Sequence, residues 1–307
     1  INLSHTSIAQ LKSKISFLKK NNIKNICIDT EGAQLRTTKV KKKIFFKKGA
    51  KIKIYNKDNI SKNKKIFIYP KFNILSCKLG KKISIGFDDL VLRIIKKDIF
   101  DNCLHTEVVS SGILESNKGV HINQDIKLNS LTKKDLEGIE IGIKNKINFF
   151  ALSFANKGKD VTDLKKLIPY KSFIISKIET ENSIKNLSEI TSKSNALLID
   201  RGDLSRYIDL TKIPYAQDYI INFGIKKKKP VFVATNLLEN MIKHSAPTRA
   251  ECNDIYNALN QGVNGLVLAA ESAIGNDPVK CVMFLKDSIS THRLFKKNKN
   301  SKKFLIN

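Results

Sequence analysis

The sequence predicts an α/β protein built on a parallel sheet or barrel, with a small all-β domain inserted into it. Three observations predict this class. Apolar runs alternate with amphipathic helical segments after residue 125, the same alternation occurs before residue 36, and a β-rich stretch without helical periodicity lies between them. Alternation of this kind favours parallel strands, because each helix supplies the crossover to the next strand.

The segment before the insertion contains one predicted helix and one predicted strand. Residues 7–20 have the apolar spacing of a helix, and residues 25–30 (NICIDT) form a short apolar run. We interpret residues 1–4 as the tail of a further strand. The sequence does not start with Met, so we expect it to begin partway through the protein, without the first βα unit of its barrel.

The inserted segment, residues 37–123, consists of short runs rich in β-branched and aromatic residues. Turn residues separate these runs, which predicts a small domain of short strands. The predicted strands are residues 44–46, 51–55, 65–68, 91–95 and 106–110.

The longest part, residues 124–293, contains five predicted strands, each followed by a helix. The strands are residues 149–154, 172–179, 196–203, 230–235 and 265–271, and the helices are residues 160–168, 183–193, 214–227, 248–261 and 278–293. With the two strands upstream, the count is one short of a closed eight-stranded barrel. We therefore predict a barrel domain in two parts, 1–36 and 124–293, a β domain at 37–123, and a basic, disordered tail at 294–307.

The composition disfavours several classes of function. The net charge is +28, but only six of the 56 basic residues are Arg, and the lysine runs contain no aromatic side chains for base stacking. We expect no specific nucleic-acid partner. No apolar run approaches the length of about 20 residues that spans a bilayer, so we expect no membrane partner. The five cysteines lack zinc-ligand or redox spacing, which indicates buried thiols in a reducing cytoplasm.

Polar triplets end two neighbouring predicted strands, KIE at 177–179 and RGD at 201–203. The carboxyl ends of adjacent parallel strands meet at one edge, where such sheets place their active sites. Glu179 and Asp203 would supply the hard oxygen ligands that suit Mg²⁺. Lys177 lies two residues before Glu179 and points to the same side of the strand. An ordinary charged loop is the alternative for either triplet alone.

Further short motifs occur in order along the chain. They are INLSH at 1–5, DTEGAQLRT at 29–37, NKGV at 117–120, ATNLLE at 234–239 and PTRAE at 247–251. Together with the two strand ends, they resemble the pyruvate kinase family from residue 1 to about residue 285. The chain looks like a short, divergent form without that family's regulatory C-terminal domain.

The resemblance implies a (β/α)8 TIM barrel, incomplete at its N-terminus, with the inserted β domain as a lid. It also implies transfer of a phosphoryl group from phosphoenolpyruvate to ADP, which gives pyruvate and ATP. A homo-oligomer is compatible with this family.

The resemblance assigns roles to individual residues. Glu179 and Asp203 would hold Mg²⁺ or Mn²⁺. Lys177 would stabilise the transferring phosphoryl group and the enolate, Arg36 would hold the phosphate, and Thr235 would help deliver the proton to the enolate. The ligands implied for a monovalent cation, usually K⁺, are Asn2, Ser4, Asp29 and Thr30. The residues implied to contact substrate or nucleotide are Asn2, His5, Lys118, Gly202, Asp203, Thr235 and the pair Asp88 and Asp89.

Several positions depart from the family pattern. Glu31 stands where the family has lysine, and Ser205 where it has glycine. Gln34 replaces a glutamate that helps to set dependence on the monovalent cation, so the sequence leaves the K⁺ requirement open. Asp200 replaces a small residue and adds a third carboxylate near a site for an anionic substrate, where it would repel the substrate or turn away.

These departures leave two alternatives to a kinase. The first is a metal-dependent lyase or aldolase of the same barrel superfamily, acting through a pyruvate enolate, because DLS at 203–205 resembles the end of its metal-binding strand. Lys177, Arg36 and the inserted domain favour the kinase, since an aldolase needs no phosphoryl clamp. The second alternative is a catalytically impaired homologue that retains the fold for binding, which Glu31 and Asp200 favour.

Overall fold

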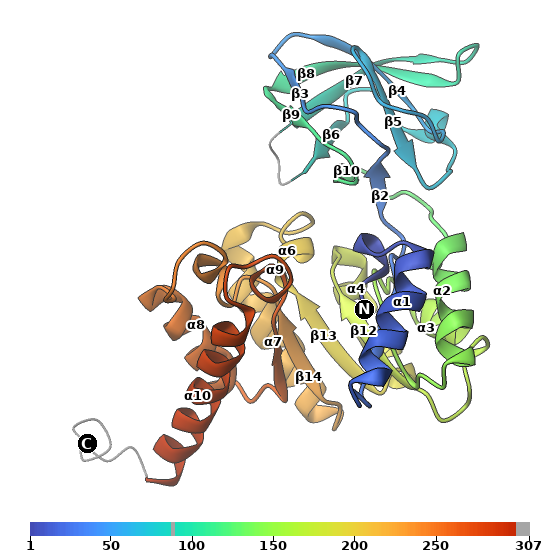
Figure 1. The fold of residues 1–307 in the computed structure, drawn as a ribbon. Coiled ribbons are helices and arrows are strands. Elements are labelled where there is room, and N and C mark those ends of the chain that lie inside the picture. The colour runs from blue at the N-terminus through green and yellow to red at the C-terminus, as the bar shows by residue number, and fades with distance from the viewer. Residues whose placement is uncertain (87–89, 299–307) are drawn as a thin grey trace. The chain divides into compact units, whose positions relative to one another are not determined.

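The computed structural model describes residues 1–86 and 90–298, which form two compact units (Figure 1). The first unit contains Ile1–Thr30 and the described residues from Lys134 onward, and the second contains Glu31–Lys133. We call them the α/β unit and the β unit. The predicted insertion, residues 37–123, lies within the β unit.

The α/β unit is built on a six-stranded sheet in which every pair of neighbouring strands is parallel. Its order is β1-β11-β12-β13-β14-β15, so each strand of the second segment is added beside the preceding one. This sequential order is that of part of a barrel, because a doubly wound sheet reverses its order at a switch point. The strands are β1 (Cys27–Asp29), β11 (Phe149–Leu152), β12 (Phe173–Ile178), β13 (Ala196–Asp200), β14 (Val231–Ala234) and β15 (Gly265–Val267).

Helices connect these strands and cover the sheet. Figure 1 shows α7 alongside β13 and β14, and it contacts both strands. The helices are α1 (Ile8–Lys20), α2 (Lys133–Lys144), α3 (Gly158–Lys165), α4 (Glu181–Lys185), α5 (Leu187–Lys193), α6 (Arg201–Leu204), α7 (Ile213–Lys226), α8 (Arg249–Asn260), α9 (Ala270–Ala273) and α10 (Pro278–Lys297). Side-chain caps fix several starts, and Thr248 forms a capping box with Glu251 at α8, as its sequence indicates.

The sequence did not predict helix α2. Two glycines, Gly138 and Gly142, weaken its helical pattern, since glycine lowers helix propensity. Both lie in close contacts: a Cβ on Gly138 would be 2.6 Å from Leu3 Cδ1, and one on Gly142 would be 3.2 Å from Ile28 Cγ1. Packing therefore requires small residues at positions 138 and 142, although glycine there lowers the helix propensity of the segment.

Other sequence predictions need correction at the ends of elements. The strand predicted for residues 196–203 ends at Asp200, because Arg201–Leu204 turns into α6. The helix predicted for residues 183–193 is two helices, α4 and α5, which meet at Asn186. Residues 1–4 are no regular strand: Asn2 makes one parallel bridge to Asp29, and a 3-10 helix follows at Leu3–His5. The tail predicted to be disordered from residue 294 is helical as far as Lys297, and residues 299–307 lie outside the described residues.

The β unit contains a closed barrel of seven strands and a separate strand pair. Its main core is an apolar cluster to which most of the strands contribute, including Ile54, Leu92 and Leu104, and Tyr55, Phe67 and Cys103 form a second, smaller cluster. The barrel order is β10-β2-β5-β4-β8-β7-β6, and β3 pairs with β9. The strands are β2 (Leu35–Thr37), β3 (Ile44–Phe46), β4 (Lys51–Tyr55), β5 (Lys65–Tyr69), β6 (Lys82–Ile85), β7 (Leu90–Asp98), β8 (Cys103–Ser110), β9 (Gly112–Leu114) and β10 (Gly119–Ile122).

None of the helices in the described part of the chain is both long and apolar enough to cross a membrane.

Candidate active site

The polar ends of β12, β13 and β14 lie together at one edge of the parallel sheet. Lys177 is near the end of β12 and Glu179 directly follows it, Asp200 ends β13, and Thr235 directly follows β14. Strands β12 and β13 pair in register from Ile175 to Ile178, so their carboxyl ends coincide. The side chains predicted to form a site are therefore brought to one place by neighbouring strands.

Lys177 lies at the centre of this group and is 7% exposed. Its Nζ is 2.9 Å from Glu179 Oε1, 3.3 Å from Asp200 Oδ2 and 3.6 Å from Asp29 Oδ2, and it donates to Ser153 Oγ at 3.3 Å. Burial disfavours its charged form, but the surrounding carboxylates outweigh burial and raise the pKa of Lys177 well above its usual range. Lys177 is therefore a fixed positive charge.

Glu179 is completely buried. Its Oε2 accepts a hydrogen bond from the backbone N–H of Phe154 at 2.5 Å, and its Oε1 lies 2.9 Å from the Lys177 ammonium. Burial, followed by the negative charges of Asp200 and Asp203, raises the pKa of Glu179 well above its usual range, against the lowering effect of Lys177. This carboxylate is thus held where a further positive charge would stabilise its ionised form.

Glu179, Asp200 and Asp203 can each offer an oxygen within 4.8 Å of the others. Ligand oxygens about 2.1 Å from a six-coordinate Mg²⁺ lie roughly 3–4 Å apart, so small side-chain adjustments give this geometry. With Asp29, four carboxylates surround Lys177, and the only other cation paired with them among the described residues is Arg206, 3.5 Å from Asp203. The excess negative charge and the all-oxygen donor set fit a divalent ion such as Mg²⁺ or Mn²⁺.

Asp200 lies within this centre and does not turn away from it. Its Oδ2 faces Lys177, and its Oδ1 accepts from the N–H of Asp203 at 3.4 Å, which caps α6. The sequence identified Asp200 only as an added charge near the substrate. The structure makes it a candidate metal ligand beside Glu179, because the last residue of β13 points to the same edge of the sheet.

Thr235 has an unusual backbone, with a φ of 68°. Positive φ is costly for a β-branched residue, and such residues concentrate at functional sites. Its Oγ1 accepts from the N–H of Gly202 at 2.9 Å and lies 3.3 Å from Asp200 Oδ1. Arg201 holds its carbonyl oxygen through Nε and Nη2. The hydroxyl is therefore fixed beside the carboxylate cluster.

The residues predicted to bind a monovalent cation form a hydrogen-bonded group. Asn2 Nδ2 donates to Asp29 Oδ2 at 3.0 Å, and the N–H of Ser4 donates to Asn2 Oδ1 at 2.7 Å. Ser153 joins the group, since its Oγ donates to Asp29 Oδ1 and its N–H to Thr30 Oγ1. The structure thus brings together Asn2, Ser4, Asp29 and Thr30, and Ser153 connects them to Lys177.

Other predicted site residues belong to the β unit or to the surface of the α/β unit. Arg36 belongs to the β unit, is buried, and donates from Nη1 to the carbonyl of Asn117 at 3.2 Å. Lys118, also in the β unit, pairs with Glu115 at 2.8 Å. His5 is exposed on the 3-10 helix of the α/β unit. The predicted nucleotide-facing pair Asp88 and Asp89 lies outside the described residues.

Sequence reasoning missed Ser153 and the role of Arg201. Ser153 directly follows β11, so the rule that located Glu179 at a strand end could also have found it. The partner of Arg201, Asp254 on α8, is 53 positions away, and no local pattern connects the two residues.

The fold and the site define a parallel α/β protein with a lysine–carboxylate centre at the carboxyl edge of its sheet. Residues 1–282 match the family model described as pyruvate kinase, barrel domain. The chain belongs to the pyruvate kinase family, which confirms the resemblance found in the sequence.

Individual relatives agree with this membership. The chain is 32% identical to a pyruvate kinase of Sporosarcina psychrophila over 92% of its own length and 50% of that protein. It is 32% identical to a pyruvate kinase of Thermotoga maritima over 93% of its length and 63% of that protein. It is 31% identical to the chloroplastic pyruvate kinase isozyme G of Nicotiana tabacum over 92% of its length and 52% of that protein. The chain therefore spans about half to two thirds of the length of these relatives.

Proposed function

We propose that the protein containing this chain is a divalent-metal-dependent phosphotransferase that moves a phosphoryl group from phosphoenolpyruvate to ADP and forms pyruvate and ATP. The observation that carries this proposal is the buried Lys177 beside the cluster of Glu179, Asp200 and Asp203. Transfer of a phosphoryl group from an enol phosphate develops negative charge on the enolate oxygen, and fixed positive charges stabilise it.

The proposed roles follow from this arrangement. Glu179, Asp203 and also Asp200 hold Mg²⁺ or Mn²⁺, which when bound neutralises charge on the phosphoryl and enolate oxygens. Lys177 directs its ammonium at the same oxygens and, being buried, keeps its charge without reorganisation of water. The Thr235 hydroxyl gives a proton to the enolate carbon and regains one from solvent, while the Asp200 carboxylate, 3.3 Å away, orients the hydroxyl by accepting its hydrogen bond.

The remaining roles rest on the resemblance. Arg36 binds phosphate, and Asn2, His5, Lys118 and the backbone of Gly202 and Asp203 contact substrate or nucleotide. In this structure the N–H of Gly202 is already bound to Thr235, so it would have to exchange that bond for a carboxylate. Asn2, Ser4, Asp29 and Thr30 would hold K⁺ if it binds, and Gln34 leaves the K⁺ requirement open. We place the protein in the cytoplasm and allow for a homo-oligomer.

We also propose the complete architecture, a (β/α)8 barrel with the β unit as its lid. The sequential parallel order from β1 to β15 supports it. For the domain limits we propose barrel parts at 1–36 and 124–293 and the inserted domain at 37–123, whereas the compact units of the structure divide after Thr30 and after Lys133.

A metal-dependent lyase acting through a pyruvate enolate is the second candidate. The position of Asp200 favours it, because a third carboxylate next to Lys177 opposes the approach of a doubly charged phosphate. A lyase would still use the metal cluster and Lys177 to stabilise the enolate.

The test is ATP formation from phosphoenolpyruvate and ADP, with Mg²⁺ or with a chelator, and with and without K⁺. We expect turnover that needs the divalent ion and disappears in Glu179→Gln, while Glu181→Gln on the exposed surface of α4 keeps it. A folded protein that forms no ATP but releases pyruvate by carbon–carbon cleavage of a 4-hydroxy-2-oxo acid would be the lyase.

A further inference from the structure

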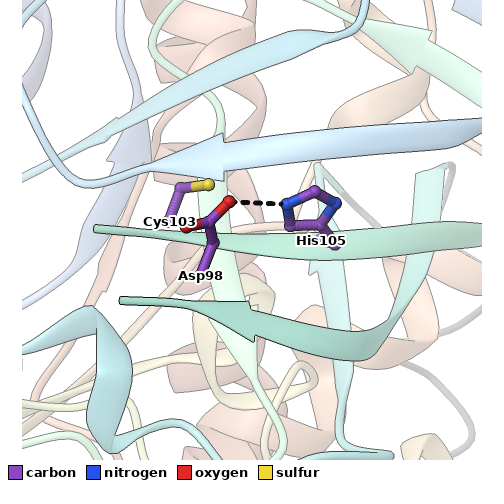
Figure 2. A group of neighbouring side chains, drawn as sticks. All are labelled: Asp98, Cys103 and His105. Carbon is purple, nitrogen blue, oxygen red and sulfur yellow. Dashed lines mark hydrogen bonds and ion pairs between the residues drawn. The ribbon is translucent and has the colours of Figure 1, made fainter. Parts of the chain in front are cut away.

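We propose that the β unit carries a separate site for Zn²⁺ or a similar thiophilic divalent ion, formed by Asp98, Cys103 and His105 (Figure 2). This site does not depend on the proposed function, since none of its residues belongs to the α/β unit. The three residues are close in sequence, but an Asp-x4-Cys-x-His order is not one of the usual zinc-ligand spacings. Their donor atoms become a set only through strand pairing.

The hairpin of β7 and β8 places the three side chains on one face. Asp98 is the last residue of β7 and pairs directly with Cys103, the first residue of β8. Residues directly opposite each other in an antiparallel pair share a face, and so do residues two apart on one strand. His105, two residues after Cys103, therefore lies on the same side as both.

The donor atoms converge, as Figure 2 shows. Asp98 Oδ2 is 3.1 Å from His105 Nε2, and one ligand atom from each of the three residues lies within 4.8 Å of the others. Ligands at about 2.0–2.3 Å from a tetrahedral Zn²⁺ are separated by roughly 3.3–3.7 Å. The carboxylate and imidazole already have about this separation, so a modest rotation of the side chains completes three of four positions.

The donor chemistry selects the ion. Thiolate and imidazole prefer zinc, cobalt or copper, whereas Mg²⁺ requires oxygen ligands. On binding, the Cys103 thiol loses its proton to solvent and a metal–sulfur bond replaces the S–H bond. The thiolate and the Asp98 carboxylate then balance the two charges of the ion, and neutral His105 adds none.

The residues around Asp98, Cys103 and His105 restrict the movement of these three side chains, as expected for metal ligands. Cys103 is fully buried against Tyr55 and Phe67, which limits its rotation. Asp98 is held by the backbone N–H of Asp101 at 3.0 Å. The Lys53 ammonium is 2.8 Å from Asp101 but 3.7 Å from Asp98, so it pairs more closely with the carboxylate that the site does not use. His105 and Asp98 remain partly exposed, which leaves a path for the ion.

A cobalt titration of the protein tests the site. Co²⁺ is added in the presence of excess Mg²⁺, which occupies oxygen-only sites, and absorption is followed. We expect one equivalent to produce a thiolate-to-cobalt charge-transfer band and the visible bands of tetrahedral cobalt, and Zn²⁺ to bleach them. Cys103→Ser should abolish the charge-transfer band, while Cys252→Ser, which removes an exposed cysteine of the α/β unit, should keep it.

Two further measurements test the proposed zinc site even if Cys103→Ser does not fold. In the unmodified protein, X-ray absorption at the zinc edge should show one sulfur and two or more nitrogen or oxygen ligands per zinc. Glu107→Gln, two residues from His105 on β8 and paired with the surface Lys51, should retain cobalt binding, whereas His105→Gln should lose it. A zinc shell without sulfur, or a cobalt band that persists in Cys103→Ser, would overturn the proposal.

Discussion

The guanidinium of Arg201 holds the main-chain carbonyl oxygen of Thr235, with Nη2 at 2.5 Å and Nε at 3.2 Å from it. Its Nη1 is in turn bound by Asp254, at 2.6 and 2.8 Å from the two carboxylate oxygens. Arg201 thus anchors the backbone just where Thr235 adopts a positive φ. The strained conformation that directs the Thr235 hydroxyl toward Asp200 is maintained by a residue that is not itself part of the carboxylate cluster.

Arg201→Lys should destabilise the protein by about 1–3 kcal/mol, because lysine cannot hold the carbonyl and Asp254 together with a planar fork and leaves buried groups without their partners. Urea unfolding followed by circular dichroism measures the change. Arg249→Lys, an exposed arginine on α8, is the control and should be neutral. Equal stability of the two variants would contradict an anchoring role for Arg201.

Lys177→Met should reduce phosphoryl transfer by roughly 10²–10³-fold, the usual effect of removing one group aimed at developing charge. Mn²⁺ binding should persist, since its carboxylate ligands remain and a repelling charge is removed. The rate of ATP formation and the paramagnetic relaxation of water by bound Mn²⁺ give the two readouts. Lys185→Met, on the exposed face of α4, serves as the control, and near-normal turnover in Lys177→Met would exclude Lys177 from the mechanism.

Asp200→Asn decides whether the third carboxylate is a metal ligand or an obstacle to substrate. If Asp200 binds the ion, as its position beside Glu179 indicates, Mn²⁺ affinity should fall about tenfold or more. The measurement is a Mn²⁺ titration with Asp209→Asn, an exposed acid, as the control. Unchanged Mn²⁺ affinity with tighter binding of phosphoenolpyruvate would show instead that Asp200 acts by repulsion.

Glu115 gives a prediction for acid stability in the β unit. Hydrogen bonds from Lys118 and Lys43 lower the pKa of Glu115 to about 2. Because the folded pKa lies below the unfolded value of about 4.3, the stabilisation is present above pH 4.3 and is lost as the pH falls toward 2.

Glu115→Gln should therefore lower the midpoint of thermal unfolding at pH 6, and the difference from the unmodified protein should disappear near pH 2. Glu137→Gln, on the exposed surface of α2, is a suitable control. A difference that is the same at both pH values would contradict the ion-pair explanation.

Much of the candidate site could be predicted because it depends on local rules. Lys177 and Glu179 are two residues apart at the end of one strand, so they point to one side, and Asp203 follows the next strand along the chain. The parallel order that brings these ends together follows from the alternation of strands and helices. Both triplets lie at one edge of the sheet in the structure, and residue spacing alone was enough to predict this.

Predictions were weakest where side-chain contacts or close packing determine the outcome. Helix α2 has two glycines that its packing against Leu3 and Ile28 requires, so its own periodicity is poor. Helix α6 begins inside a predicted strand because Asp200 caps it. In both cases a contact made elsewhere in the fold outweighs the local preference of the residues.

By itself, the sequence determined the class of fold, the family, and the strand ends at which the charged residues gather, because these follow from periodicity and from motifs in order. Only the tertiary structure decided that Asp200 faces Lys177, that Ser153 connects Asp29 to Lys177, and that Arg201 anchors Thr235. It also decided that Asp98, Cys103 and His105 share one face. The physical reason is that each of these contacts depends on strand register or on pairing between distant segments, which folding sets and no single stretch of sequence contains.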